Sequence, residues 1–300
     1  WVTAMARLFT SLIELTKVLP NEDAAVAYFQ SIRWKNGAFC PHCGSAKVYH
    51  FTDKHWHKCG DCRARFSIKV GTVMEGTKIP VRSWLMAIWL ITSHKKGIAS
   101  TQLARDLGVT QKTAWFMLHR LRHAAHTRSF SRTLKGTVEA DEVFIGGKDR
   151  NKHKDKRGKK PKAIVLGMLE RGGELRTIHI GELWDVRQHV LANIEPGAAL
   201  ITDEGHSYKI LGRNYKHETV NHTKGEYGRG PVHTNGIEGY WSQLKRQIYG
   251  IHHFVSPKHL HNYIAESSWR YNRRAVENAP RMGEFIARLD GRLTYKALIQ

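Results

Sequence analysis

The chain lacks a long hydrophobic run. Its best apolar run, residues 84–91, is far shorter than the roughly 20 residues that cross a bilayer. The first twenty residues include Glu14 and Lys17, and they have neither the apolar core nor the cleavage site of a signal peptide. We therefore expect a cytoplasmic protein without a membrane partner. The chain opens on Trp1, and Met5 is a plausible start.

Acidic residues are also scarce. The sequence has 26 Asp and Glu against 48 Lys and Arg, which gives a net charge of +22 and a pI near 10.0. This excess favours a polyanionic partner, because each neutralised phosphate releases condensed counterions. The alternative is a basic protein that is merely soluble. The length of 300 residues leaves room for one large domain and one or two small modules.

Cysteine is limited to four residues, and all of them fall in one motif. The spacing Cys-x2-Cys-x15-Cys-x2-Cys is typical of two knuckles that bring four thiolates to one Zn²⁺ ion. Gly44 and Gly60 follow the second and third cysteines, where a knuckle needs unusual backbone angles. Two disulfides are the alternative, which a reducing compartment disfavours. The expected zinc ligands are Cys40, Cys43, Cys59 and Cys62.

The residues between the knuckles predict two strands, 48–51 and 55–58. We therefore expect a small zinc ribbon in which the ion is structural, because so short a region has little core of its own. Three nearby histidines are expected at the surface or facing DNA: His42, His55 and His57.

The next segment predicts a helix-turn-helix. An apolar pattern over 81–91 indicates one helix, which Gly97 ends. Ser100 is expected to cap a second helix, Gly108 to form a turn, and Thr110 to cap a third helix. This arrangement favours DNA binding, with an ordinary helical hairpin as the alternative. The expected DNA contacts on the last helix are Gln111, Lys112, Thr113, Arg120 and Arg122.

After residue 128 the pattern becomes rich in strands. The order strand-strand-strand-helix-strand-helix-strand-helix fits an RNase H-like α/β layer. The expected strands are 136–145, 163–169, 175–180, 198–202 and 215–220. The expected helices are 186–194, 207–211 and a long region from 235.

Acidic residues in this region suggest a metal site. Asp203 follows a buried strand, and α/β sheets place their sites at the carboxyl ends of strands. A turn aspartate is the alternative, and Glu204 is the neighbouring rival. Asp141 lies between Glu139 and Glu142, and the local sequence does not choose among these three carboxylates.

Glu238 lies on the expected helix that begins near Asn235. Lys245 is seven residues further on and points in nearly the same direction. The carboxylate could therefore join a metal site while the lysine reaches a phosphate. A capping box at Asn235 is the alternative role for Glu238. The two aspartates upstream favour the metal ligand, since clustered carboxylates hold the Mg²⁺ or Mn²⁺ ions that phosphodiester chemistry needs.

Two basic stretches remain. Residues 148–162 hold nine Lys or Arg against two Asp, which predicts either a phosphate-holding loop or a solvated disordered one. Residues 269–274 mix aromatic and arginine side chains, and they could pack beneath the site or contact DNA. Further candidate DNA contacts are Lys148, Lys152 and Arg246.

Together these residues resemble the bacterial insertion-sequence transposases of the DDE type, in the zinc-ribbon-bearing ISXO-like group related to the Merlin superfamily. The resemblance runs from Asp23 to Arg274. Its most specific parts are Cys-Pro-His-Cys-Gly at 40–44, Asp-Glu-x4-Gly-Gly-Lys at 141–148, Thr-Asp at 202–203 and His-x-Asn-x-Ile-Glu at 233–238.

The resemblance implies three catalytic magnesium ligands, namely Asp141, Asp203 and Glu238. Asn235 is the alternative third ligand, and Lys245 matches a basic residue of the family. The implied activity is Mg²⁺-dependent cleavage and strand transfer at terminal inverted repeats, by a homo-oligomer on double-stranded DNA. A DNA-binding regulator without catalysis and a nuclease that cuts without joining are the alternatives.

The expected organisation has four parts. An N-terminal segment (1–20) precedes the zinc ribbon (21–78) and the helix-turn-helix (79–127). The RNase H-like catalytic domain is expected to occupy residues 128–300.

Overall fold

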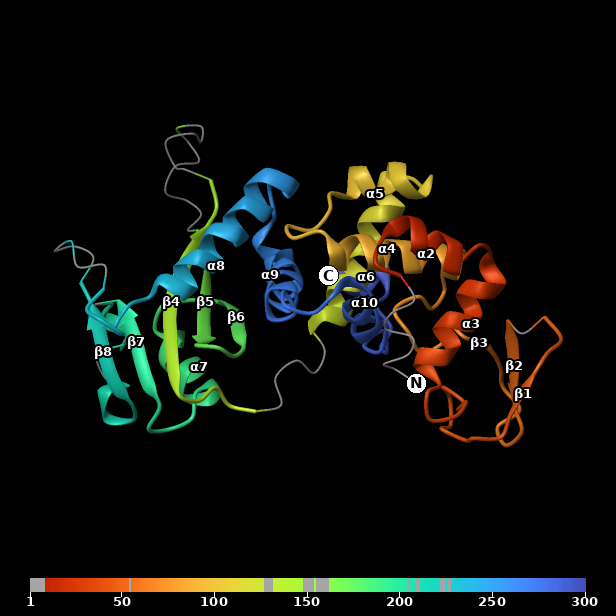
Figure 1. The fold of residues 1–300 in the computed structure, drawn as a ribbon, viewed down its shortest axis with the longest axis horizontal. Coiled ribbons are helices and arrows are strands. Elements are labelled where there is room, and N and C mark those ends of the chain that lie inside the picture. Colours follow the sequence, from red (N-terminus) through yellow and green to blue (C-terminus); the bar gives the residue numbers. More distant parts are fainter. Residues whose placement is uncertain are drawn as a thin grey trace. The chain divides into compact units, whose positions relative to one another are not determined.

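The computed structural model divides into two compact units, drawn in Figure 1. One consists of Trp1–Thr127 and Arg273–Gln300, and the other of Arg128–Asn272. The structure describes residues 9–53, 55–126, 132–147, 154, 162–203, 205–208, 211–221, 225 and 228–300.

The first unit contains the predicted zinc ribbon. Its three strands form an antiparallel sheet in the order β1-β2-β3, and their bounds are Val48–His50, Trp56–Cys59 and Arg65–Ser67. Sequence patterning predicted the first two strands and missed the third. Its small core joins Cys40, Cys59 and Phe66. His57, expected at the surface, is instead fully buried, because its ring packs edge-on against Trp34.

Helices make up the rest of the first unit. Their bounds are α2 Leu12–Val18, α3 Glu22–Arg33, α4 Val81–Ser93, α5 Ser100–Leu107, α6 Gln111–His126, α10 Asn278–Ile286 and α11 Tyr295–Ile299. The turn between α5 and α6 has the predicted glycine, with Gly108 in the left-handed region at φ 64°. Thr110 caps α6 as expected, since its hydroxyl accepts from the amide of Thr113. Ser100 does not cap α5; it is the first helical residue, and Ala99 precedes it.

The C-terminal residues 273–300 fold with the first unit, although the sequence assigned them to the catalytic domain. The reason is the apolar face of α10, on which Met282 and Phe285 are buried where the helix packs against α4 and α3. Arg281 reinforces this packing by donating to the carbonyl of Thr92, the penultimate residue of α4.

The second unit is built on a five-stranded sheet in the order β6-β5-β4-β7-β8. The strands are β4 Thr137–Ile145, β5 Ala163–Glu170, β6 Leu175–Ile180, β7 Ala199–Asp203 and β8 Lys216–Val220. The first three strands pair in antiparallel fashion, whereas β7 is parallel to both β4 and β8. This mixed α/β sheet with β4 at its centre confirms the predicted RNase H-like fold.

Helices cover both faces of the sheet. The helical segments are α7 Asp185–Asn193, α8 Asn235–Lys245, a π-helical turn Arg246–His252 and α9 Pro257–Asn272. Side chains of α7 pack with Val138 and Ala140 on one face, and side chains of α8 and α9 pack with Val143 and Ile145 on the other. The side chains of β4 therefore alternate between the two covered faces of the sheet.

In the second unit one expected helix is absent, and one of two open roles for a segment is favoured. The helix expected at 207–211 is replaced by short 3-10 turns at His206–Tyr208 and Leu211–Arg213. In the aromatic and basic segment 269–274, Trp269 and Arg270 are buried, and Arg270 pairs with Glu266. These two residues therefore pack inside the unit.

Among the described residues, no helix combines the length and the apolar character needed to cross a bilayer.

Candidate active site

Three carboxylates meet where the central strand passes the end of its parallel neighbour. Oxygens of Asp141, Glu142 and Asp203 all lie within 4.8 Å of one another. The parallel pairing of β4 with β7 explains this proximity, because Glu139 lies opposite Ile201, and Asp141 and Asp203 each follow two residues further along their strands. The site is therefore at the carboxyl end of β7, as the sequence predicted for Asp203.

Glu142 is the member of this cluster that sequence reasoning set aside. Strand alternation places it on the opposite face from Asp141, yet its carboxylate ends beside that of Asp141. The only sequence signal was its position next to Asp141. Glu139, the third carboxylate that the local sequence could not distinguish from Asp141, is not in the cluster.

Asp141 is held in place from both sides. Its Oδ2 accepts a hydrogen bond from the indole nitrogen of Trp241 at 2.9 Å, and its Oδ1 accepts from the amide of Glu142 at 2.8 Å. Trp241 reaches Asp141 by lying against Gly167, the residue opposite Asp141 on β5. A Cβ atom at Gly167 would come within 2.6 Å of the indole ring. The glycine thus makes room for the tryptophan that orients Asp141.

Without a cation, two carboxyl groups of the cluster ionise less readily than they would in water. Burial, with a further contribution from Asp203, raises the pKa of Asp141 to about 6. Burial is also the main cause that raises the pKa of Glu142 to about 7, and repulsion from Asp141 adds to it. A divalent cation would reverse this preference, because it stabilises the ionised carboxylates.

A buried hydroxyl lies beside Glu142. Burial raises the pKa of the Tyr208 hydroxyl well above its ordinary value, and the interaction of this hydroxyl with the Glu142 carboxylate lowers the pKa of that carboxyl. Within the described part of the chain, no contact of the hydroxyl or of Oε1 of Glu142 meets the strict geometry of a hydrogen bond. Oε1 of Glu142 therefore keeps acceptor capacity that a cation could use. Carboxylate oxygens at this spacing fit a hard divalent ion.

Glu238 is near the cluster but is not part of it. Its carboxylate accepts a hydrogen bond from the Thr234 hydroxyl at 2.7 Å. Its charge makes a small contribution to the raised pKa of Asp141. Thr234, rather than Asn235, is the residue that precedes the helix, and its side chain makes no capping hydrogen bond, so the alternative capping box at Asn235 does not form.

The remaining predicted residues of α8 lie on its surface. Asn235 is exposed at its start, and Lys245 and Arg246 are exposed at its end. Arg246 donates to the carbonyl of Ser242, one turn back. Three predicted positions lie outside the described residues: Lys148, Lys152 and Glu204.

The four cysteines form a second cluster, in the first unit. Their sulfur atoms all lie within 4.8 Å of one another, and the Cys40–Cys62 and Cys43–Cys59 pairs are each 3.6 Å apart. All four are free thiols, so the alternative of two disulfides does not apply. Amide N–H groups that donate to Cys40 and Cys59 are those expected of a zinc knuckle. The donor set therefore fits one structural Zn²⁺.

The two knuckle glycines act differently. Gly44 adopts the left-handed conformation that the sequence predicted, with φ 76°. Gly60 does not; there the left-handed residue is Arg63. Gly60 instead provides space, because a Cβ atom would lie 3.1 Å from Lys47 and 3.2 Å from Tyr49.

The predicted DNA contacts on α6 divide into two groups. Gln111 and Lys112 are exposed at its start, and Thr113 beside them is partly exposed. The other two expected DNA contacts, Arg120 and Arg122, are only 8% and 1% exposed. They are not available to DNA, because this part of α6 is covered within the first unit. Arg120 lies over its neighbour Phe116, with the guanidinium carbon 4.4 Å from the ring centre.

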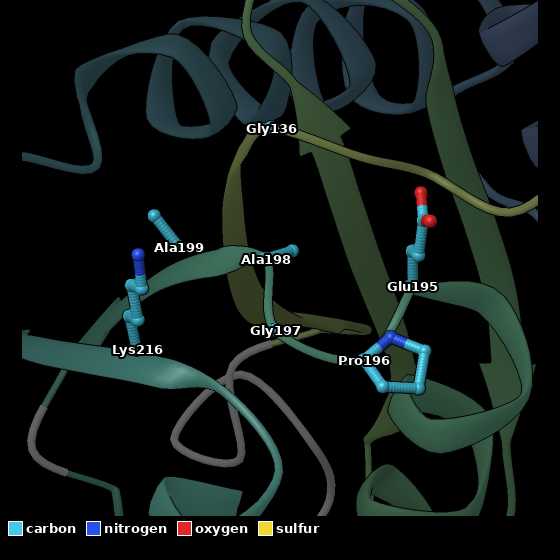
Figure 2. Close-up of a pocket in the computed structure, with 7 residues that line it drawn as sticks. All are labelled: Gly136, Glu195, Pro196, Gly197, Ala198, Ala199 and Lys216. Atoms are coloured by element: carbon cyan, nitrogen blue, oxygen red, sulfur yellow. The ribbon is translucent and has the colours of Figure 1, made fainter.

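An open hollow of about 450 Å³ lies elsewhere on the second unit and is shown in Figure 2. It is lined by Gly136, Glu195, Pro196, Gly197, Ala198, Ala199 and Lys216. These residues begin or precede β4, β7 and β8, at the strand ends opposite to Asp203. The hollow is therefore separate from the carboxylate cluster.

Comparison with known proteins adds to this picture. Residues 133–272 match the model of the ISXO2-like transposase domain, and residues 20–65 match that of the transposase zinc-ribbon domain. Over 269 residues the chain is 27% identical to an uncharacterized protein in transposable element ISH50 of Halobacterium salinarum, which covers 83% of this chain and 90% of the relative.

One solved structure is similar at a lower level. It is a chain from the crystal structure of a pre-cleavage Mos1 transpososome, with 13% identity over 70% of this chain and 79% of that chain. The TM-score of 0.28 is too low to carry an argument.

Proposed function

The chain combines an ISXO2-like transposase domain with a transposase zinc ribbon, and from this we propose that it is a DDE-type transposase that cuts and joins DNA at the ends of its element. A transposase role follows from the match of residues 133–272 to the ISXO2-like transposase domain. We infer the cleavage and joining chemistry from the carboxylates of this domain.

The observation that carries the proposal is the cluster of Asp141, Glu142 and Asp203 at the centre of this domain. Two of its carboxyls have raised pKa values because they are buried together. Such a site favours a divalent cation, and its all-oxygen donor set suits Mg²⁺ or Mn²⁺. Ions bound there would supply an activated oxygen nucleophile and offset the charge on the leaving oxygen.

We assign the metal-holding roles to Asp141, Asp203 and Glu238. Asp141 is already oriented by Trp241, and Glu238 would join by leaving its hydrogen bond with Thr234. Glu142 is the rival for the third position because it already lies in the cluster. An ionised carboxylate binds Mg²⁺ better than an amide does, which disfavours Asn235. Lys245 would contact a substrate phosphate from the end of α8.

DNA would be held by the first unit and by the basic charge of the chain. Gln111, Lys112 and Thr113 at the start of α6 would enter a major groove. The zinc ribbon, with one structural Zn²⁺, would help to recognise the terminal inverted repeats. Target DNA would be held by phosphate contacts from basic residues such as Arg246. Pairing two element ends requires a dimer or larger assembly, and the expected location is the cytoplasm.

The test is cleavage of element-end DNA by the purified protein in Mg²⁺, beside the Asp203→Ala variant. We expect the variant to lose cleavage and joining by about 10³-fold or more, because several kcal/mol of transition-state stabilisation by the metal are lost. The matched control is Glu195→Ala, which removes a carboxylate at the opposite strand ends. It should keep wild-type rates.

Other outcomes select the alternatives. DNA binding without cleavage by the wild-type protein, across Mg²⁺ and Mn²⁺, would favour a DNA-binding regulator. Cleavage without strand transfer would favour a nuclease that cuts without joining.

A further inference from the structure

A buried carboxylate outside the metal cluster connects β4 to α8. Glu139 lies two residues before Asp141 on the same face of the strand and is 1% exposed. Its Oε1 accepts a hydrogen bond from Nε of Arg171 at 2.8 Å. Its Oε2 accepts from the amide of Ile237 at 2.9 Å, in the first turn of α8. One carboxylate therefore binds both an arginine and the start of the helix.

Arg171 holds the segment that leads into α8. One terminal guanidinium nitrogen donates to the carbonyl of Pro231 at 2.6 Å. The other donates to the carbonyl of His233 at 2.7 Å and to its Nδ1 at 3.0 Å. Arginine only donates, so Nδ1 of His233 acts as the acceptor. The amide of Arg171 also donates to the carbonyl of Thr137 at the start of β4, which fixes the backbone of the arginine to the same strand.

The start of α8 lies directly against this ion pair. A Cβ atom at Gly236 would come within 2.8 Å of Oε2 of Glu139 and 2.9 Å of Leu169. Only glycine lets the helix approach so closely. The carboxylate also satisfies an amide that a helix start leaves without an intrahelical partner, at the positive end of the helix dipole.

We propose that Glu139 and Arg171 form a positioning clamp that sets α8, and with it Glu238 and Trp241, against Asp141. The inference rests on the proposed function, since it assigns these two residues to the support of that metal site. The helix provides the link: it begins at the clamp, and it carries Trp241, which donates to Asp141. Neither clamp residue contacts the reacting atoms; both act through α8.

The clamp is distinguished from a merely stabilising ion pair by metal affinity. The full-length, zinc-loaded protein is titrated with Mn²⁺ alone, by electron paramagnetic resonance, in Arg171→Lys and Glu139→Gln variants. Lysine cannot make the forked contacts, and glutamine keeps an acceptor for Ile237 but loses the charge that pairs with Arg171. We expect Mn²⁺ to bind about tenfold or more weakly in both variants, because supporting residues tune metal sites by that amount.

A matched ion pair in the same unit provides the control. Arg132 donates to Glu170 at 2.8 Å, and Glu170 pairs with Val138, whose side chain packs on the face of the sheet that α7 covers. Arg132→Lys and Glu170→Gln should leave the Mn²⁺ affinity unchanged. Cleavage by the clamp variants should need about tenfold more Mg²⁺ and recover in part when Mg²⁺ is raised, whereas a variant that is only less stable should show no such shift.

A single substitution in the clamp could prevent folding, so a double substitution that removes both charges serves as a further test. The double variant Glu139→Gln and Arg171→Met removes both charges and so leaves no uncompensated buried ion. It should fold and still bind Mn²⁺ weakly. Folded variants that bind Mn²⁺ as tightly as the wild type would overturn the clamp and leave the proposed function intact.

Failure of the proposed function gives a different pattern. If the wild-type protein binds Mn²⁺ through Asp141 but does not cut DNA, the proposed transposase chemistry is wrong. Weaker Mn²⁺ binding by the clamp variants would still support the clamp in that case. A wild-type protein without Mn²⁺ binding would overturn both.

Discussion

At the scale of single residues, Asp141 and Glu142 show how burial prepares a site for a cation. Their folded pKa values of about 6 and 7 lie above the ordinary values of 3.8 and 4.5. The shifts are upward, so the folded state favours the protonated carboxyls. Their contribution to stability is fully present below about pH 4 and is lost as pH rises through 6 to 7.

This gives a pH prediction for the protein without divalent cation at the carboxylates. The double variant Asp141→Asn and Glu142→Gln removes the buried charges, so it should be more stable than the wild type at about pH 8. The gain should shrink towards pH 5, and its upper limit is on the order of 3 kcal/mol per carboxyl. Urea unfolding of the zinc-loaded protein at the two pH values measures it.

Mg²⁺ supplies the control for the pH prediction. It should stabilise the wild type at pH 8 and have no effect on the double variant. A stability difference that does not change with pH would show that the two carboxyls are solvated rather than buried together.

The sequence predicted residues correctly where the spacing of a motif determines which side chains meet. It could not choose among residues where tertiary packing determines which side chains meet. The cysteine spacing predicted the four-thiol cluster because two knuckles of this length can converge on one ion. Strand alternation could not choose among Glu139, Asp141 and Glu142. The tertiary structure separates them, since Glu139 pairs with Arg171 whereas the other two meet Asp203.

At the scale of elements, α8 is the helix on which the site depends. It packs across β4 and β5, it begins at the Glu139–Arg171 pair, and it carries Glu238 and Trp241. Two glycines of this helix differ sharply in their surroundings. Gly236 is pressed against Glu139, whereas a Cβ atom at Gly239 would have no atom within 4 Å.

We therefore predict opposite effects for alanine at these two positions. Gly239→Ala should stabilise the protein by about 0.5–1 kcal/mol, because alanine reduces the backbone entropy lost in a helix. Gly236→Ala should destabilise it by about 1–3 kcal/mol through overpacking, and should also weaken Mn²⁺ binding. Thermal unfolding and Mn²⁺ titration measure the two effects. Equal behaviour of the two variants would contradict the close approach of α8 to Glu139.

Elements were predictable where their periodicity was strong. All five strands of the large sheet were expected from sequence within one or two residues at each end. The helix expected at 207–211 was wrong, and two 3-10 turns take its place. A segment so short has too few residues for periodicity to distinguish a helix from a turn.

At the scale of the whole molecule, the net charge of +22 predicts DNA binding that weakens steeply with salt. Lys112 is exposed at the start of α6, and we expect it to contact a DNA phosphate there. The Lys112→Gln variant should reduce the slope of log affinity against log salt by about 0.9, because one phosphate contact is lost.

Fluorescence anisotropy with a double-stranded element end, over several salt concentrations, measures this slope. Lys216→Gln is the control, since Lys216 lines the hollow at the opposite strand ends. The Lys216→Gln substitution changes the net charge by the same amount as Lys112→Gln. It should change the slope of log affinity against log salt less. If both substitutions act equally, the total charge, rather than the start of α6, governs binding.

The sequence by itself determined the four-cysteine cluster, the order of the five strands of the large sheet, and the place of Asp203 at a strand end, because each depends on local spacing or periodicity. Only the tertiary structure decided which carboxylates meet, that Arg120 and Arg122 are buried, and that residues 273–300 fold with the first unit. These depend on contacts between segments that are distant in the chain. Local patterns contain no information on which buried faces meet, so such contacts become visible only once the chain is folded.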